Sequence, residues 1–419
     1  MSGERSQGNM LTAAVVAGCL ETVADAPSPG DDLRVLLADA LACMQAAPVD
    51  RTGRALAADP PPALGEVSCR LSKLCLRAHA ADLDDIYWPT ATHIGSVIWP
   101  VVLDLGARYR STGAELARAA RTGYQIAGYL SALFGPRHAA QWHVTATAGM
   151  IGAAASAAVV MRLDTAALTA ACGHAAAMAG GLGQSILERS ATGAFHRSAA
   201  AVTGALAAEF AATGAEPPAA ILEGPRGLLT LLAPDRPASA PAQVDIIAHT
   251  SVRIFPVNGF AQGAVQFAAR LGRESRARSD MATPTRLTVH VAKPVADATS
   301  GDPGGAWWDL RGAVAAAWLS GDPFNLAPTD ASTALRSMVT VEPDRDSVLT
   351  TSVTATTPTG TTSAGADTPP GYRPSGPDGQ RLLRDKWNYL LADEPLRLAD
   401  RILDRGIDSD DVDTLLRHT

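Results

Sequence analysis

Histidine and aspartate side chains gather in one part of this sequence, and together they have the chemistry for proton transfer. They are His79, Asp82, Asp84, Asp85, His93, His143 and His196. An imidazole titrates near neutral pH, and a carboxylate close to it can fix its tautomer, so this combination is typical of general acid–base catalysis. The sequence contains no phosphate loop and no GxSxG, CxxC or HExxH motif. Most enzyme classes that such motifs define are therefore disfavoured, and no cofactor is expected.

The first segment that carries these residues is AHAADLDDIYWPTATHIGSVIWP, residues 78–100. Asp82 follows a predicted helix, and His93 lies eight residues beyond Asp85. An aspartate and an imidazole so close along the chain could form an acid–base pair in which the carboxylate orients the ring. For Asp85 the favoured interpretation is structural, capping or solvating the loop, and for His93 it is functional.

Two further histidines precede segments of small residues. In QWHVTATAGMIGAAA (141–155), Thr145 or Thr147 is the expected N-cap, so His143 would lie near the positive end of a helix, where a neutral imidazole is favoured and anions are attracted. In ERSATGAFHRSAAA (188–201), Arg189 and Arg197 flank His196 and could hold a carboxylate bidentately. The alternatives are an ordinary loop histidine and ordinary surface cations.

The elements that must position these residues are helices. From residue 11 to 232 apolar residues recur at helical spacing, for example over 33–46, 66–81, 112–133 and 198–213. Alternating Val- and Thr-rich runs then predict strands at 286–294, 337–344 and 347–357, with helices near 259–271 and 309–319. Helical spacing resumes at 381–392 and 411–419. The prediction is a mainly α protein with an all-helical domain (1–245), a smaller α+β lid domain (246–380) and C-terminal helices (381–419) that pack back on the helical domain.

Composition excludes several classes of function. The 42 acidic and 35 basic residues give a net charge of −7 without a basic run, so we expect no nucleic-acid partner. The five cysteines have no CxxC spacing, which disfavours a disulfide framework or a zinc site. The uncharged runs 144–161 and 165–187 consist mostly of alanine and glycine, which favours close helix packing over membrane insertion. The polar start MSGERSQGN makes the cytoplasm the expected location.

Several segments, taken in order, resemble the MmgE/PrpD family, which includes 2-methylcitrate dehydratase, cis-aconitate decarboxylase and iminodisuccinate epimerase. The segments are AHAADLDD with THIGSVIWP, GYQIAGYL, HVTATAG, LDTAALTAACGHAAAMAGGL, ILEGPRGLLTLLA and RIFPVNGFAQG. The resemblance implies an all-helical domain, an α+β lid, an active site between them, a homodimer, and metal-free chemistry on small carboxylic acids.

Matched residue by residue, the resemblance assigns catalytic roles to His93, His143 and Asp82. His196 matches a histidine of a segment that usually reads TKRFH, and Gly193 stands where that segment has lysine. Three further replacements are Ile86 for threonine, Arg253 for lysine and Phe255 for tyrosine. We expect His196, Arg253, Arg197, Ile86, Trp88 and Phe255 to bind the substrate.

These replacements remove charge and hydroxyl groups, and carboxylates left unpaired in a closed site cost on the order of a few kcal/mol. We therefore predict a lyase, isomerase or cyclase that acts on a less anionic, larger carbonyl or carboxylate compound, an intermediate of specialised metabolism. One alternative is the family activity itself, a 2-methylcitrate dehydratase or cis-aconitate decarboxylase. The other is a homodimeric binding protein that has lost catalysis, for which Gly193 is the best support.

Overall fold

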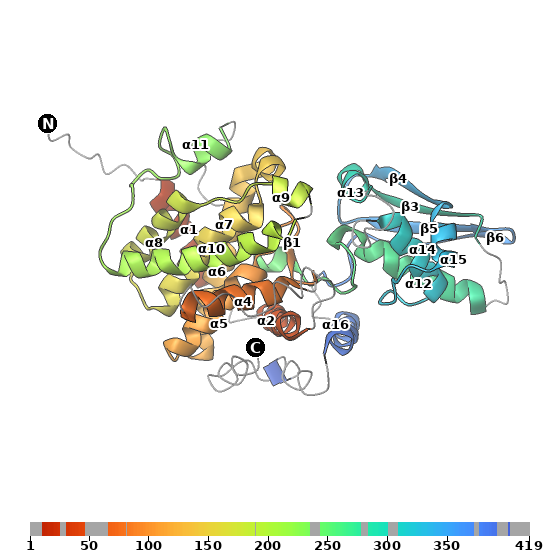
Figure 1. Cartoon of the computed structure of the whole chain (residues 1–419), viewed down its shortest axis with the longest axis horizontal. Coiled ribbons are helices and arrows are strands. Elements are labelled where there is room, and N and C mark those ends of the chain that lie inside the picture. Colours follow the sequence, from red (N-terminus) through yellow and green to blue (C-terminus); the bar gives the residue numbers. More distant parts are fainter. Residues whose placement is uncertain are drawn as a thin grey trace. The chain divides into compact units, whose positions relative to one another are not determined.

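The computed structural model describes residues 11–25, 31–46, 66–80, 82–188, 190–234, 244–277, 284–300, 309–372, 377–391 and 401–402. Its contacts divide the chain into two compact units (Figure 1). The first comprises Met1–Ser251 and Leu390–Thr419, and the second comprises Val252–Tyr389. The predicted class, mainly α with a smaller α+β part, is confirmed. The domain limits at 245 and 380 stay a prediction, and the expected helix 411–419 and Arg189 lie outside the described residues.

The first unit is built almost wholly from helices. They are α1 (Leu11–Asp25), α2 (Asp31–Gln45), α4 (Glu66–Ala80), α5 (Gly95–Arg108), α6 (Gly113–Gln141), α7 (Val144–Val160), α8 (Thr165–Met178), α9 (Gln184–Leu187), α10 (Thr192–Ala212), α11 (Leu228–Leu232) and the 3-10 helix η2 (Ile247–His249). A two-residue strand β1 (Ile86–Tyr87) pairs antiparallel with β2 (Thr250–Ser251). The pairing joins the connection between α4 and α5 to residues 250–251, the last residues of the first segment of this unit.

Helix α7 lies at the centre of the first unit, and every one of its residues is buried. It packs against α6 and α10, and glycines let the backbones approach closely. A Cβ atom added at Gly152 would lie 2.6 Å from the carbonyl oxygen of Gly123 in α6, and one added at Gly204 in α10 would lie 2.6 Å from that of Met150. The small residues of 144–161 are therefore a close-packed scaffold.

Two expected helix starts were wrong. The N-cap of α7 is His143, because Thr145 and Thr147 already lie inside the helix. Their hydroxyl groups bind the amide of His93 and the ring of His138. His196 lies within α10, in its second turn, whereas we expected it to precede a helix. Both histidines therefore belong to helix termini and not to loops.

The second unit contains a four-stranded sheet with the order β4-β3-β5-β6. Its elements are the 3-10 helix η3 (Gly259–Ala261), α12 (Gln262–Ala277), β3 (Arg286–Ala292), α13 (Lys293–Ala298), α14 (Leu310–Ser320), α15 (Asp330–Arg336), β4 (Val339–Arg345), β5 (Thr351–Thr357), β6 (Gly360–Ala366) and α16 (Pro377–Leu390). β3 pairs parallel with β4 and antiparallel with β5, which forms a hairpin with β6. The parallel pair requires a crossover, which α13, α14 and α15 supply.

Among the described residues, no helix is long and apolar enough to cross a membrane.

Candidate active site

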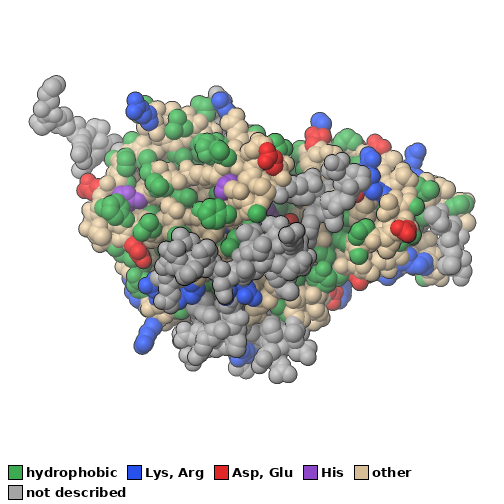
Figure 2. All heavy atoms as spheres, viewed as in Figure 1, with side chains coloured by type: hydrophobic (Ala, Val, Ile, Leu, Met, Phe, Trp, Pro, Cys, Tyr) green, Lys and Arg blue, Asp and Glu red, His purple; other side chains and the backbone are tan. Residues whose placement is uncertain are grey.

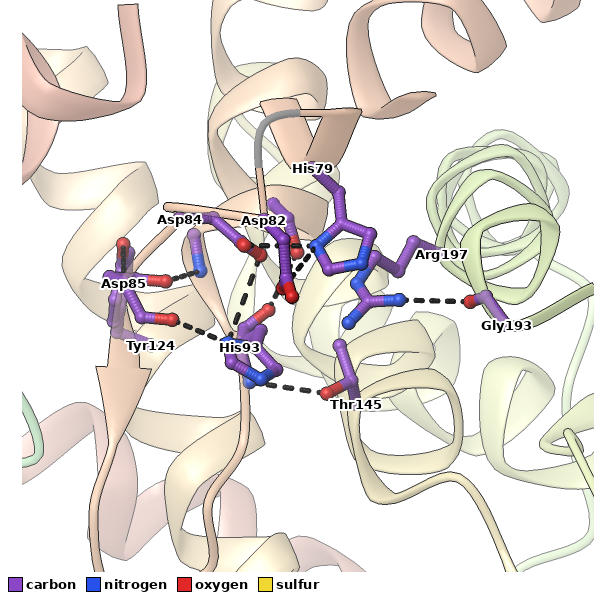
Figure 3. Close-up of polar contacts among 11 residues, drawn as sticks. His79, Asp82, Asp84, Asp85, His93, Tyr124, Thr145, Gly193 and Arg197 are labelled. Carbon is purple, nitrogen blue, oxygen red and sulfur yellow. Dashed lines mark hydrogen bonds and ion pairs between the residues drawn. The ribbon is translucent and has the colours of Figure 1, made fainter. Parts of the chain in front are cut away.

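The α4–α5 connection holds His93 through main-chain contacts (Figure 3). Its Nδ1 lies 2.7 Å from the carbonyl oxygen of Asp85, and its own amide donates to Thr145 Oγ1 at 3.1 Å. A carbonyl oxygen can only accept, so Nδ1 must carry the proton. The neutral ring then has its lone pair on Nε2, which is the form that a general base requires.

His79, at the end of α4, forms a second imidazole–carboxylate arrangement beside the first. Its Nδ1 lies 2.9 Å from Asp84 Oδ1 and 3.9 Å from Asp82 Oδ1, and Asp84 Oδ2 lies 3.8 Å from His93 Nδ1. The carboxylate of Asp84 is buried, and its two oxygens lie near one imidazole each. The centroids of the two rings are 6.1 Å apart. Asp82, predicted to orient a catalytic histidine, is placed beside His79 in a left-handed turn with φ 49°.

The same cluster contains the donor set of a possible metal site. His79, Asp82 and Asp84 each offer one ligand atom, and these atoms lie within 4.8 Å of one another. The 2.9 Å separation between His79 and Asp84 is also that of an ordinary N–H···O hydrogen bond. A shared proton therefore accounts for the contact between His79 and Asp84. The 3.9 Å distance from His79 to Asp82 is that of a longer ion pair.

Asp85 lies on the other side of the connection and anchors it to the core. Its carboxylate accepts the amide of Gly95 at 2.9 Å and the hydroxyl of Tyr124 at 2.5 Å. Burial raises the pKa of Asp85 to about 7, with the charge of Asp84 adding to the effect and the two hydrogen bonds opposing it. The structural interpretation of Asp85 holds in that it binds the start of α5, but the residue is buried and not solvated.

His143 and His196 form a pair at the positive ends of α7 and α10. Their Nδ1 atoms are 3.2 Å apart, and their ring centroids are 5.4 Å apart. One Nδ1 must donate and the other must accept, so the two neutral rings hold complementary tautomers. One ring therefore presents a lone pair at Nε2 and the other presents an N–H.

Gly181 positions this histidine pair. Its carbonyl oxygen accepts the amide of His143 at 2.8 Å, and its φ of +113° is one that only glycine adopts readily. A Cβ atom there would lie 2.9 Å from Ala146 Cβ and 3.4 Å from His196 Nδ1. Glycine is thus needed both for the backbone angle and for the space.

The electrostatic surroundings keep the pair neutral. Burial lowers the pKa of His143 well below its ordinary value, and the charges of Arg197, His196, His93 and His79 lower it further. Burial and Arg197 also lower the pKa of His196. Arg197 itself is buried and donates from Nη1 to the carbonyl oxygen of Gly193 at 2.9 Å. His93 and His79 are therefore close enough to His143 for their charges to affect its pKa.

The remaining predicted residues occupy two different units. Ile86 is buried in β1, and the indole of Trp88 donates to Ser251 Oγ at 2.9 Å. Arg253 and Phe255 belong to the second unit, where both are buried and the ring of Phe255 packs edge-on against Phe324. Substrate binding by these four residues stays a prediction.

Sequence reasoning gave no specific catalytic partner to three residues of the site, although His79 was among the acid–base candidates and Thr145 was an expected N-cap. His79 could have been assigned from its spacing to Asp82 and Asp84 at a helix end, which brings the three groups to one turn. Tyr124 carried no usable signal, because a single hydroxyl within a helix is more often structural. Thr145 was interpreted as an N-cap, and that interpretation did not foresee its contact with the amide of His93.

Comparison with known proteins covers this part of the chain. Residues 75–240 match the model of the MmgE/PrpD N-terminal domain, a range that includes all the histidines and aspartates of the cluster. No curated protein matches the chain.

Proposed function

Since the chain belongs to the MmgE/PrpD family, we propose that it is a metal-independent acid–base enzyme that removes a proton beside a carbonyl or carboxylate group. Members of the family are generally lyases of the dehydratase type. Two contacts support the proposal most directly: His93 Nδ1 lies 2.7 Å from the Asp85 carbonyl oxygen, and the Nδ1 atoms of His143 and His196 lie 3.2 Å apart.

His93 is the proposed base. Its Nδ1–H donates to the Asp85 carbonyl oxygen, so its Nε2 takes the substrate proton, and the carboxylate of Asp84 stabilises the imidazolium that results. Asp82, through His79, adds negative charge on the same side.

The His143–His196 pair is the proposed acid. The ring whose Nδ1 accepts carries its proton on Nε2, and from there it can protonate a leaving group or the developing enolate oxygen. The imidazolium formed at His93 then returns its proton to this pair, so that all the rings end the cycle in their neutral forms. Arg197 remains cationic and stabilises negative charge that develops on the substrate.

The expected substrate is less anionic than a tricarboxylic acid. Gly193 has no side chain that could pair with a carboxylate, and Arg197 binds its carbonyl oxygen. Ile86 is a buried apolar side chain at the position where the resemblance leads us to expect a threonine hydroxyl. We propose elimination, decarboxylation, isomerisation or cyclisation of a keto or carboxylic acid with one or two charged groups, in specialised metabolism.

The test is a screen for proton abstraction in D₂O. Full-length protein is incubated with a panel of keto and carboxylic acids that includes 2-methylcitrate and cis-aconitate, and mass spectrometry records deuterium uptake and loss of water or carbon dioxide. We expect exchange or conversion of compounds with one or two charges, abolished in His93→Ala and retained in the control His290→Ala, which replaces a half-buried histidine of β3 in the second unit. Turnover of the two tricarboxylates would instead establish the family activity. Exchange that survives in His93→Ala, or no exchange of any compound, would overturn the proposal.

We also propose that the chain forms a homodimer through α10. Phe195, Leu206 and Phe210 are spaced by 11 and 4 residues, so they share one face of α10, and they are 57%, 60% and 55% exposed. Hydrophobic side chains occur over this side of the first unit in the view of Figure 2, with few charged ones among them. An apolar face of this kind is typical of a subunit contact.

Sedimentation velocity tests the dimer. Leu206→Glu should convert a dimer into a monomer, since it places a charge in the buried centre of the contact. Leu231→Glu, on the equally exposed Leu231 of α11, should leave the dimer intact. A wild-type protein that sediments as a monomer would contradict the proposal.

A further inference from the structure

The second unit contains a cavity that the proposed reaction does not use. Its volume is about 640 Å³, and all its lining residues lie between Phe255 and Asn388, within that unit. This volume falls within the range of small-molecule sites in proteins. Three arginines contribute to the lining: Arg270, Arg273 and Arg381.

Two helices present matching faces to this cavity. Gln266, Arg270 and Arg273 lie on α12 at spacings of 4 and 3 residues. Arg381, Asp385 and Asn388 lie on α16 at the same spacings. Each set therefore shares one helix face, and the polar ends of the side chains meet from two sides of the cavity.

The apolar wall of the cavity is aromatic. The ring of Phe324 packs edge-on against Phe255, with centroids 5.1 Å apart, and lies 5.3 Å from the ring of Tyr389. Phe267 adds a third lining ring, and the guanidinium of Arg270 lies 5.7 Å from its centroid. Flat apolar groups stack well on such surfaces.

The charges at the cavity favour an anion. The arginines outnumber the two lining carboxylates, Asp322 and Asp385. Asp322 already accepts the amide of Phe324 at 2.9 Å through Oδ1.

Arg270 and Arg381 pair with Glu274 and Asp378 of their own helices at 3.7 and 2.9 Å. All four side chains are exposed, and ion pairs of this kind contribute little free energy. The two guanidinium groups can therefore exchange these partners for one anion that they reach from two helices.

We infer that this cavity binds a small molecule with a flat aromatic body and a single anionic group, in which the ring stacks against Phe324 and the anion pairs with Arg270 and Arg381. The inference is independent of the proposed reaction, because none of these residues belongs to the histidine cluster of the first unit. It also gives Phe255 a place in the wall of a ligand site.

The test compares a charged probe with its neutral counterpart. Full-length protein is titrated with 2-naphthoate and with 2-naphthalenemethanol in a calorimeter. The double variant Arg270→Ala/Arg381→Ala should bind 2-naphthoate at least about tenfold more weakly, since charge-assisted hydrogen bonds are lost, and should bind the alcohol as the wild type does. Phe324→Ala should weaken binding of both probes. Arg311→Ala, an exposed arginine of α14 outside the cavity lining, is the matched control and should change neither.

Two outcomes would overturn the inference. One is a wild-type protein that does not bind 2-naphthoate at millimolar concentration. The other is binding that the double arginine variant retains in full, because the probe would then occupy another apolar surface, such as the exposed face of α10. Thermal unfolding of each variant, followed by circular dichroism, establishes that the exposed arginines were replaced without loss of the fold.

Discussion

The two imidazole pairs of the first unit differ in what surrounds them. His79 and His93 face oxygen atoms, namely the carboxylate of Asp84 and the carbonyl of Asp85. His143 and His196 face each other and the cation Arg197, at the start of two helices. Acceptors fix a proton on one nitrogen of a ring, whereas a second imidazole shares one. This difference supports the proposal that the first pair supplies the base and the second pair supplies the acid.

Removing one ring from each pair should have the largest effect. We expect His93→Ala and His143→Ala each to reduce turnover by about 10²- to 10⁴-fold, the usual contribution of general acid–base catalysis. Deuterium exchange should separate the two, because loss of the base abolishes exchange, whereas loss of the acid leaves exchange and abolishes elimination. Equal loss of exchange in both variants would show that the pairs act as one unit.

The second largest effect is expected from a change at Gly181, whose carbonyl oxygen binds the amide of His143. Gly181→Ala should lower the free energy of unfolding by about 1–3 kcal/mol, because alanine must adopt an unfavourable φ. Turnover should fall with it, since Gly181 binds the amide of His143. Gly193→Ala is the matched control, because its Cβ would meet only the end of the Ile186 side chain, at 3.0 Å. Urea unfolding measures both variants, and equal stabilities would refute this role of Gly181.

The stability of the first unit should depend on pH through the buried carboxyl of Asp85, the residue whose carbonyl oxygen binds His93. Folding raises the pKa of Asp85 from 3.8 to about 7, so the folded chain holds a proton that the unfolded chain has released between these values. Its contribution to stability is present below pH 4 and is lost as the pH rises toward 7. His143 works in the opposite direction, because its pKa is lowered from 6.5 and its contribution is lost as the pH falls below that value.

Asp85→Asn isolates the first of these two contributions. Between pH 5 and 7 the wild type should lose about 1 kcal/mol of stability per pH unit relative to the variant. Urea unfolding at pH 5, 6 and 7 gives the difference between the two proteins, from which the histidine contributions cancel. A difference that does not change with pH would mean that Asp85 is ionised throughout.

The smallest expected effect is that of metal removal. If His79, Asp82 and Asp84 are held together by protons, dialysis against EDTA should leave turnover and the unfolding temperature unchanged. A loss of turnover that Mn²⁺ or Zn²⁺ restores would make these three residues metal ligands and would reverse our assignment of the first pair.

Helical spacing and small-residue runs predicted the class of fold because both are local properties of the chain. Edge strand β6 escaped prediction, since GTTSAGA has no apolar alternation and forms a strand only through its pairing with β5. In the site, the order of the histidines and aspartates along the sequence indicated the chemistry. The contact between His93 and the Asp85 carbonyl could not be foreseen, because a main-chain acceptor is the same at every residue.

The complete burial of α7 limits how this protein can change over time. Because every residue of α7 is buried, a larger side chain would clash at each of its positions. The helix should therefore change little, and His143 at its start should keep its place. Adaptation to a new substrate is therefore expected around it, for example at Gly193 in the first turn of α10, where an added Cβ would meet only the end of the Ile186 side chain. The acid that we propose at His143 then stays in place while the side chains around it change.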